Sequence, residues 1–246
     1  MADTREEYVD RTYRNRMAAP DLVAFRVQIR ETDIYILAQR DLTAEATRVA
    51  RRARATLEAW IESNPEFATT LEPLPCPPDA PRIIREMCAA ADAAGVGPMA
   101  SVAGAIAEAV ARALAPKSSE VIVENGGDTY LMGNRERVAA VLAGKSPLSS
   151  RIGLVIPPGR LPLAICTSSA TVGPSLSFGR ADAAVVVSDS GALADAVASA
   201  VGNRVRTADD LPAAVELGLG IARVLHVVAI LGDRMAAGGD LILRRL

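Results

Sequence analysis

The chain has 246 residues, half of them hydrophobic, and a formal net charge of -2. This length allows one large domain or two closely packed halves with a sizeable core. The small charge and an aromatic content of only 3% argue against a nucleic-acid partner, which requires a basic surface or stacking rings. The polar N-terminus has no signal-peptide core, and no charge-free apolar run of about 18 residues occurs. We therefore expect a cytoplasmic protein without a membrane span.

Histidine and cysteine chemistry has few residues available in this chain. The three cysteines, Cys76, Cys88 and Cys166, match neither a zinc motif nor a disulfide framework. The single histidine, His226, lies in an apolar run and is expected in the core or on a strand face. A histidine-based metal centre or a Ser-His-Asp triad is therefore not predicted.

The first half begins with a polar arm, residues 1–20, followed by two strands within 22–39 that turn near 30–33. The apolar spacing then predicts three helices, separated by a strand and a proline-rich loop. The helices span 44–61 with Thr43 as N-cap, 81–94, and 101–116 with Ser101 as N-cap; the strand spans 67–74. The last helix is rich in Ala and Gly, so a protein segment or a ligand can approach its backbone closely.

The chain is organised around Val121–Gly133, where a β-branched strand is broken by Asn125, Gly126 and Gly127 and followed by Asp128. One interpretation is a β-hairpin with an ordinary Gly-Gly turn. The alternative is a ligand-facing turn, in which backbone amides and one carboxylate meet a phosphate, a ring or a metal. The rest of the chain has to decide between the two.

The second half predicts further strands and helices in a similar order. The expected elements are a helix at 136–143, a hairpin formed by 152–156 and 161–166, a strand at 183–188, helices at 191–202 and 209–221, and strands at 225–231 and 241–246. We therefore predict an α+β fold in which helices cover one face of a largely antiparallel sheet. Residues 21–246 are expected to form one domain of two halves, about 21–143 and 151–246, each of β-β-α-α-β-β type.

Two polar residues, Asp195 and Ser199, interrupt an otherwise nearly apolar helix and share one face because they are four positions apart. A helix that is apolar around most of its girth is buried, and a carboxylate on it needs a partner. Carboxylate and hydroxyl oxygens are ligands suited to magnesium. A solvated face, or an arginine paired with Asp195, remains the alternative.

A loop from Gly173 to Asp182 places several serines between glycines, and Arg180 adds a positive charge. Such a loop binds phosphate through hydroxyls and amides. A solvent-exposed loop is the equally simple interpretation, with Asp182 as a cap for the strand that follows.

Several short motifs follow one another in an order that resembles the ApbE-like superfamily. They are Gly-Pro-Met-Ala-Ser-Val-Ala-Gly-Ala-Ile-Ala at 97–107, Glu-Asn-Gly-Gly-Asp at 124–128, Thr-Ser-Ser at 167–169, Ser-Leu-Ser-Phe-Gly-Arg-Ala-Asp-Ala at 175–183, and Ala-Asp-Ala-Val-Ala-Ser-Ala at 194–200. The pattern is most similar to a bacterial and archaeal branch designated uncharacterised protein family 0280. Proteins of the superfamily are magnesium-dependent flavin transferases, which cleave FAD and attach FMN to a threonine of a target protein.

The resemblance implies a set of site residues. Magnesium binding is implied for Asp195, Ser199 and Ala103, and flavin-nucleotide binding for Asn125, Gly126, Gly127, Asp128, Thr167, Ser168 and Gly104. The implied ligands are Mg²⁺ and FAD or FMN, with a partner protein as acceptor and a homo-oligomer as a further option. The pattern departs from the family at two positions: Ala103 stands where a lysine is expected, and Pro174 where relatives often have histidine.

These departures leave three functional hypotheses. The first is a magnesium-dependent flavin-nucleotide transferase or pyrophosphate-cleaving enzyme. The second is a binding protein that holds a flavin or another small molecule on the same scaffold without chemistry. The third, a flavin acceptor at Ser169–Thr171, rests on a faint likeness to a flavinylation site whose expected upstream aspartate is Ile165 here.

Overall fold

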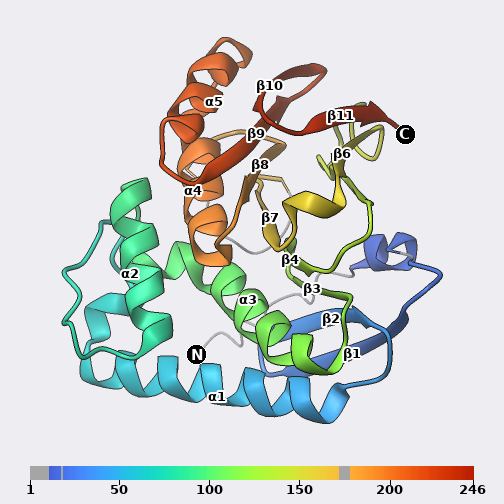
Figure 1. Ribbon diagram of the computed structural model, residues 1–246. Helices are drawn as coiled ribbons and strands as arrows, with labels where there is room; N and C mark the ends of the chain where they lie inside the picture. The colour runs from blue at the N-terminus through green and yellow to red at the C-terminus, as the bar shows by residue number, and fades with distance from the viewer. Residues whose placement is uncertain (1–10, 18, 172–177) are drawn as a thin grey trace, which may run out of the picture.

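The computed structural model describes residues 11–17, 19–171 and 178–246 (Figure 1). Within these residues an eight-stranded sheet runs in the order β1-β2-β3-β4-β7-β8-β9-β10. Every neighbouring pair in it is antiparallel. The strands are β1 (Val23–Ile29), β2 (Thr32–Ala38), β3 (Val121–Asn125), β4 (Asp128–Met132), β7 (Leu163–Ser168), β8 (Ala183–Ser188), β9 (Val224–Leu231) and β10 (Arg234–Gly239).

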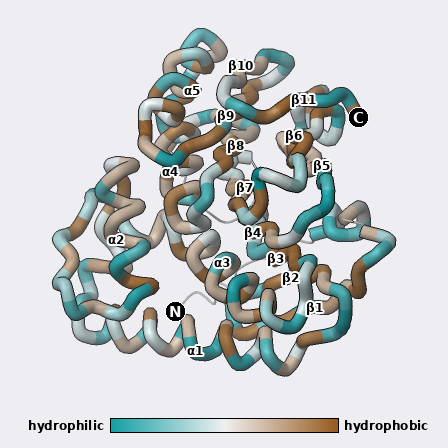
Figure 2. The backbone as a smooth tube through the Cα atoms, in the orientation of Figure 1, coloured by the Kyte–Doolittle hydropathy of each residue, from teal (hydrophilic) through white to brown (hydrophobic). Residues whose placement is uncertain are grey.

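Helices cover one face of this sheet, as the sequence predicts (Figure 1). The helices that pack on the sheet are α1 (Thr43–Ser63), α3 (Val102–Leu114), α4 (Gly191–Arg204) and α5 (Leu211–Leu219), while α2 (Arg82–Ala94) packs on α4. Side chains alternate across the strands, so Val121 and Val123 enter the core beneath the helices while Ile122 packs on the other side. Figure 2 shows the hydrophobic strands at the centre of the molecule, with hydrophilic segments toward the outside. The α+β fold class is confirmed.

The opposite face carries a second core that is covered by a small three-stranded sheet. This sheet has the order β11-β6-β5 and consists of β5 (Arg137–Ala140), β6 (Ile152–Ile156) and β11 (Ile242–Arg245). Leu154 and Ile156 of β6 pack there with Leu163 of β7 and Val228 of β9. The sequence did not predict this layer, because β11 pairs with the distant strand β6 and because the segment that forms β5 was expected to be helical.

Three predicted elements of the chain are wrong. Residues 67–74 contain no strand: Pro65–Ala68 is a 3-10 turn whose Phe67 is buried against the edge of Trp60. Residues 136–143 are not a helix but β5, because pairing with β6 outweighs the weak preference of a short segment. The strands β6 and β7 do not form a hairpin either, since each joins a different sheet.

Smaller differences concern the C-terminal strands and the helix caps. The strand β10 was missed because its sequence, Arg-Met-Ala-Ala-Gly-Gly, has little strand preference and depends on pairing with β9. Thr43 is the first residue of α1 rather than its N-cap, and its amide donates a hydrogen bond to Asp41 Oδ1 at 2.8 Å. Ser101 is the N-cap residue of α3, but its hydroxyl donates to the carbonyl of Pro98.

The helical run Pro98–Lys117 is long and apolar enough to cross a membrane by length and composition alone. However, 56% of that window is buried inside the protein. Its central part is α3, which packs on β3 and β4 of the sheet and against the neighbouring helices α1 and α4. This extent of burial is typical of a helix in the core of a protein.

His226 is confirmed as a buried strand residue, because it lies on β9 and is only 3% exposed. The amide of Leu241 donates to its Nδ1 at 3.3 Å, and Nε2 has no hydrogen-bond partner among the described residues. Burial of the imidazole lowers the pKa of His226 below its usual 6.5.

This lowered pKa predicts that His226 by itself destabilises the fold in acid. As the pH falls, His226 of the unfolded chain takes up a proton before His226 of the folded protein does. The contribution of His226 to stability is therefore present above about pH 6.5 and is lost as the pH falls through the lower folded-state pKa. Because all other titratable groups are common to the two proteins, we expect the urea midpoint of the parent to fall relative to that of His226→Gln as the pH is lowered from 7 to 5, so that the two slopes of midpoint against pH differ. Equal slopes in the two proteins would contradict this assignment.

Candidate functional site

The central turn joins β3 to β4 through Gly126 and Gly127. Their φ angles are +73° and +107°, which only glycine adopts without strain, and Asn125 pairs with Asp128 across the strands. This is a two-residue β-hairpin turn. The amide of Gly127 donates to Glu124 Oε1 at 2.8 Å, so it is already used within the protein. The β-hairpin is therefore confirmed, while the ligand-facing role of the turn stays a prediction in which the Gly127 amide is already occupied.

The two residues that flank the turn connect it to other elements. Asn125 Nδ2 donates to the carbonyl of Ala103, in the first turn of α3, at 3.1 Å. Asp128 Oδ1 accepts the amide of Thr167 on β7 at 3.2 Å. Both side chains are buried. The turn, the start of α3 and the end of β7 therefore form one connected group.

The helices α3 and α4 meet at their N-terminal turns, where each receives a carboxylate from the other. The amide of Gly104 on α3 donates to Asp195 Oδ2 at 2.9 Å. The amide of Gly191 on α4 donates to Glu108 Oε2 at 2.6 Å. The first amides of a helix lack partners within the helix and favour negative charge. The contact therefore orients both carboxylates through backbone groups.

Two glycines make this approach possible. A Cβ on Gly104 would overlap the carbonyl oxygen of Gly191 and lie 2.9 Å from Cβ of Asp195, and a Cβ on Gly191 would overlap the carbonyl oxygen of Gly104. The small-residue surface predicted for α3 is thus occupied by a protein segment, α4, rather than left open to a ligand.

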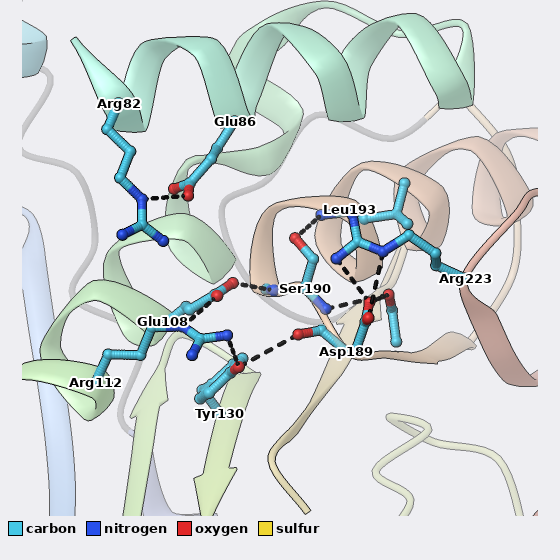
Figure 3. Close-up of polar contacts among 11 residues, drawn as sticks. Arg82, Glu86, Glu108, Arg112, Tyr130, Asp189, Ser190, Leu193 and Arg223 are labelled. Atoms are coloured by element: carbon cyan, nitrogen blue, oxygen red, sulfur yellow. Dashed lines mark hydrogen bonds and ion pairs between the residues drawn. The ribbon is translucent and has the colours of Figure 1, made fainter. Parts of the chain in front are cut away.

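Glu108 belongs to a further set of polar contacts beside this crossing, drawn in Figure 3. Arg112 Nε donates to Glu108 Oε1 at 2.7 Å, and Arg112 Nη2 donates to the Tyr130 hydroxyl at 2.8 Å. That hydroxyl donates in turn to the carbonyl of Asp189 at 3.2 Å. Because the partners satisfy one another, this network holds α3, β4 and the start of α4 together. Sequence reasoning missed it, although Glu108 and Arg112 have the i,i+4 spacing of a helix pair.

The electrostatics of the group are dominated by two carboxylates without a cation. Burial raises the pKa of Asp195 to about 7. Burial and then the negative charge of Asp195 hold the pKa of Asp128 well above its usual value. Neither carboxylate forms an ion pair with Lys, Arg or His within 11–17, 19–171 and 178–246. The alternative in which an arginine neutralises Asp195 is therefore not seen there.

Six of the predicted site residues are brought together by these contacts: Ala103, Gly104, Asn125, Asp128, Thr167 and Asp195. Ser199 lies one helical turn beyond Asp195 and is half-buried. Ser168 lies against α4, with its hydroxyl 3.3 Å from the place of a Cβ on Gly202. Gly126 is exposed at the tip of the turn.

The donors at this place fit a hard divalent cation. The described residues contain no group of three or more His, Cys, Asp or Glu side chains that could hold a metal. Magnesium does not need one, because it binds one or two carboxylates, keeps several waters and takes the remaining ligands from substrate phosphates. Asp195, Asp128 and the Ser199 hydroxyl offer such oxygens. The uncompensated charge of the two carboxylates is what a cation would relieve.

The structure describes only part of the serine-rich loop at 173–182. Residues 172–177, including Pro174, lie outside the described part of the chain. At its end, Asp182 Oδ2 accepts the amide of Gly232 at 2.7 Å, so Asp182 anchors the β9–β10 turn. The hydroxyls of Ser169 and Thr171 are both bonded to Asp182, at 2.7 Å to its carbonyl and 3.3 Å to its Oδ1.

The fold is that of ApbE-like proteins. The flavin transferase ApbE from Vibrio cholerae superposes with a TM-score of 0.55 over 89% of this chain and 97% of its own, at 12% sequence identity. The ApbE protein from Thermotoga maritima superposes with a TM-score of 0.56 over the same shares, also at 12% identity. Identity this low supports the shared fold alone.

The family is established by sequence. The profile of the family described as AbpE bacteria matches residues 14–228, and the chain belongs to this family. A UPF0280 protein of Methanocella arvoryzae is 46% identical over 88% of both chains. A UPF0280 protein of Methanosarcina barkeri is 39% identical over 87% of this chain and 85% of its own. The resemblance drawn from the short motifs is confirmed.

Proposed function

We propose that this protein binds a flavin nucleotide, FAD or FMN, beside the Asn125–Asp128 turn and acts with Mg²⁺ as a flavin-nucleotide transferase or pyrophosphate-cleaving enzyme. The observation that carries the proposal is the pair of carboxylates formed by the buried Asp128 and the partly buried Asp195, which have no cationic partner among the described residues. They lie on the fold that this chain shares with flavin transferases. A bound Mg²⁺ would supply the missing positive charge, and phosphate oxygens of the nucleotide would complete its ligands.

Each residue of the site has a distinct role in this proposal. Asp195 binds the cation, and the amide of Gly104 holds its second oxygen in place at 2.9 Å. Asp128 shares the charge and is oriented by the amide of Thr167. A Mg²⁺ ion held by these residues would offset the charge of the phosphate oxygens and polarise the P–O bond that links two phosphates. Asn125 keeps the start of α3 against the turn through the carbonyl of Ala103.

A second candidate function is binding without chemistry. Ala103 has no charged side chain at the position where the resemblance expects a lysine, so one source of charge stabilisation for a leaving phosphate is absent. The protein would then hold a flavin nucleotide, or another phosphorylated molecule, for a partner protein. The two functions differ in turnover and share the binding site.

A titration of the purified protein with FAD, with and without Mg²⁺, tests both functions. Flavin fluorescence reports binding, and mass spectrometry reports AMP. Magnesium-dependent binding with AMP release supports the enzyme. Binding without AMP or FMN, also after addition of threonine-containing acceptor peptides, supports the binding protein. If neither FAD nor FMN binds in the presence of Mg²⁺, the proposed function is wrong.

The substitution Asp195→Asn tests the role of Asp195 in metal binding separately from its effect on the stability of the metal-free protein. Because the folded-state pKa is raised, Asp195 stabilises the metal-free protein most below about pH 4, and this contribution is lost as the pH rises through about 7. At pH 8, we expect metal-free Asp195→Asn to melt several degrees higher than the parent. Millimolar Mg²⁺ should raise the melting temperature of the parent and leave that of the variant unchanged.

The exposed residue Asp92 on α2 provides a matched control, since Asp92→Asn makes the same chemical change away from the turn. This control should respond to Mg²⁺ as the parent does. An equal Mg²⁺ response in Asp195→Asn would remove Asp195 from the metal site.

A further inference from the structure

A short N-terminal segment packs on the sheet beside the central turn. It consists of residues 11–17 around the 3-10 turn Thr12–Arg16, and we call it the N-terminal brace (Figure 1). It contacts Asp33 of β2 and Glu124 of β3. These two side chains alternate with Ile34 and Val123, which enter the core beneath the helices. The brace therefore lies on the face of the sheet opposite the helices.

The contacts of the brace are short and largely buried. Arg14 Nε donates to Glu124 Oε2 at 2.6 Å, and its Nη2 donates to the carbonyl of Asp33 at 2.7 Å. The Tyr13 hydroxyl donates to Glu124 Oε1 at 2.7 Å. Arg14 is 7% exposed and Glu124 is 1% exposed. Burial opposes ionisation of Asp33, but the guanidinium groups of Arg26 and Arg14 outweigh it and lower its pKa to about 2. The ion pairs thus persist at neutral pH.

Glu124 transmits these contacts to the turn. The same oxygen that accepts the Tyr13 hydroxyl also accepts the amide of Gly127. The side chain of Arg11 approaches from the brace as well, with Nη1 donating to the carbonyl of Asp33 at 2.7 Å. Its Nη2 lies 3.5 Å from the position that a Cβ on Gly126 would occupy. The brace therefore holds a guanidinium against the tip of the turn.

We infer that Arg11 is a ligand-binding residue of this site, held by the brace so that its guanidinium contacts a phosphate of a nucleotide bound at the Gly126–Gly127 turn. This inference rests on the proposed function. The side chain of Arg11 is 19% exposed, so part of it is open to a ligand while the rest is held by Asp33. A guanidinium is suited to phosphate because it presents several donors in one plane.

The test compares Arg11→Gln with the matched control Arg26→Gln. Arg26 also forms an ion pair with Asp33, at 2.6 Å, but it belongs to β1. The control therefore removes the same charge and an ion pair to the same carboxylate. The probes are FAD, riboflavin, which has no phosphate, and inorganic pyrophosphate, each titrated by calorimetry in the presence of Mg²⁺.

We expect Arg11→Gln to weaken FAD binding about tenfold or more, in line with the loss of a charge-assisted hydrogen bond. Binding of riboflavin should stay within about twofold of the parent, as should binding of both flavins by Arg26→Gln. Equal FAD affinities in the two variants, or an equal loss of FAD and riboflavin in Arg11→Gln, would overturn the inference while leaving the proposed function intact.

Titration with pyrophosphate distinguishes a failure of the proposed flavin function from a failure of the inference about Arg11. If the parent binds pyrophosphate but no flavin, the flavin function fails, and a selective loss of pyrophosphate binding in Arg11→Gln still supports a phosphate contact. If the parent binds neither FAD nor pyrophosphate, both the proposed function and the inference fall.

Discussion

Replacing Gly104 with alanine is expected to lower the free energy of unfolding by about 3 kcal/mol, at the upper end of the cost of overpacking a core. The new Cβ would overlap the carbonyl oxygen of Gly191, which is backbone and cannot rotate away. The helices α3 and α4 would have to separate, which would also lengthen the bond between the Gly104 amide and Asp195. Alanine favours a helix over glycine by only about 1 kcal/mol, so the clash outweighs the gain in propensity.

Urea unfolding of Gly104→Ala and Gly191→Ala measures this effect, and both variants should be destabilised because the approach is reciprocal. Gly159 supplies the control, since no atom lies within 4 Å of the position of its Cβ. We expect Gly159→Ala to change stability by less than about 0.5 kcal/mol. Unfolding midpoints for the two helix variants equal to that of Gly159→Ala would show that the crossing tolerates a methyl group.

Removing the Glu124 side chain is expected to cost about 3–5 kcal/mol, the typical loss when one partner of a buried ion pair is deleted. Glu124→Ala would leave the guanidinium of Arg14, the hydroxyl of Tyr13 and the amide of Gly127 without this acceptor. Arg14 is 7% exposed and so cannot recover the interaction from water easily. The brace should detach from β3, and the turn should loosen with it.

Two measurements check this result. Urea unfolding gives the stability, and amide hydrogen exchange should increase at residues 124–130 in Glu124→Ala. The exposed residue Glu58 is the control: its ion pairs with Arg30 and Arg54 lie at the surface, where such pairs are worth about 0–1 kcal/mol. A loss no greater in Glu124→Ala than in Glu58→Ala would mean that the brace contributes little to the fold.

The periodic elements of this fold could be predicted from local sequence. The alternation in 22–39 predicted β1 and β2, and the apolar spacing predicted a helix over 44–61, close to the observed α1 at Thr43–Ser63. Gly95 adopts the left-handed conformation that ends α2, as expected of glycine after a helix. The Gly-Gly hairpin and the buried helix α4 were also predicted. Each depends on residues only a few positions apart.

The elements that were missed depend on partners far along the chain. Residues 137–140 have no local strand pattern and become β5 because β6 pairs with them. The strands β6 and β7 look like a hairpin locally, but the second core separates them into two sheets. The polar residue Glu108 resembles a surface residue of a helix, yet it accepts an amide from Gly191, 83 positions away.

The candidate site shows the same division. The sequence by itself determined the family, the Gly-Gly-Asp turn and the i,i+4 spacing of Asp195 and Ser199, because these are properties of short segments. Only the tertiary structure decided that Asp195 meets the amide of Gly104, that its charge raises the pKa of the buried Asp128, and that Arg11 reaches the turn. The physical reason is that burial and electrostatic interaction depend on which distant segments pack together, and the local sequence pattern does not encode those distances.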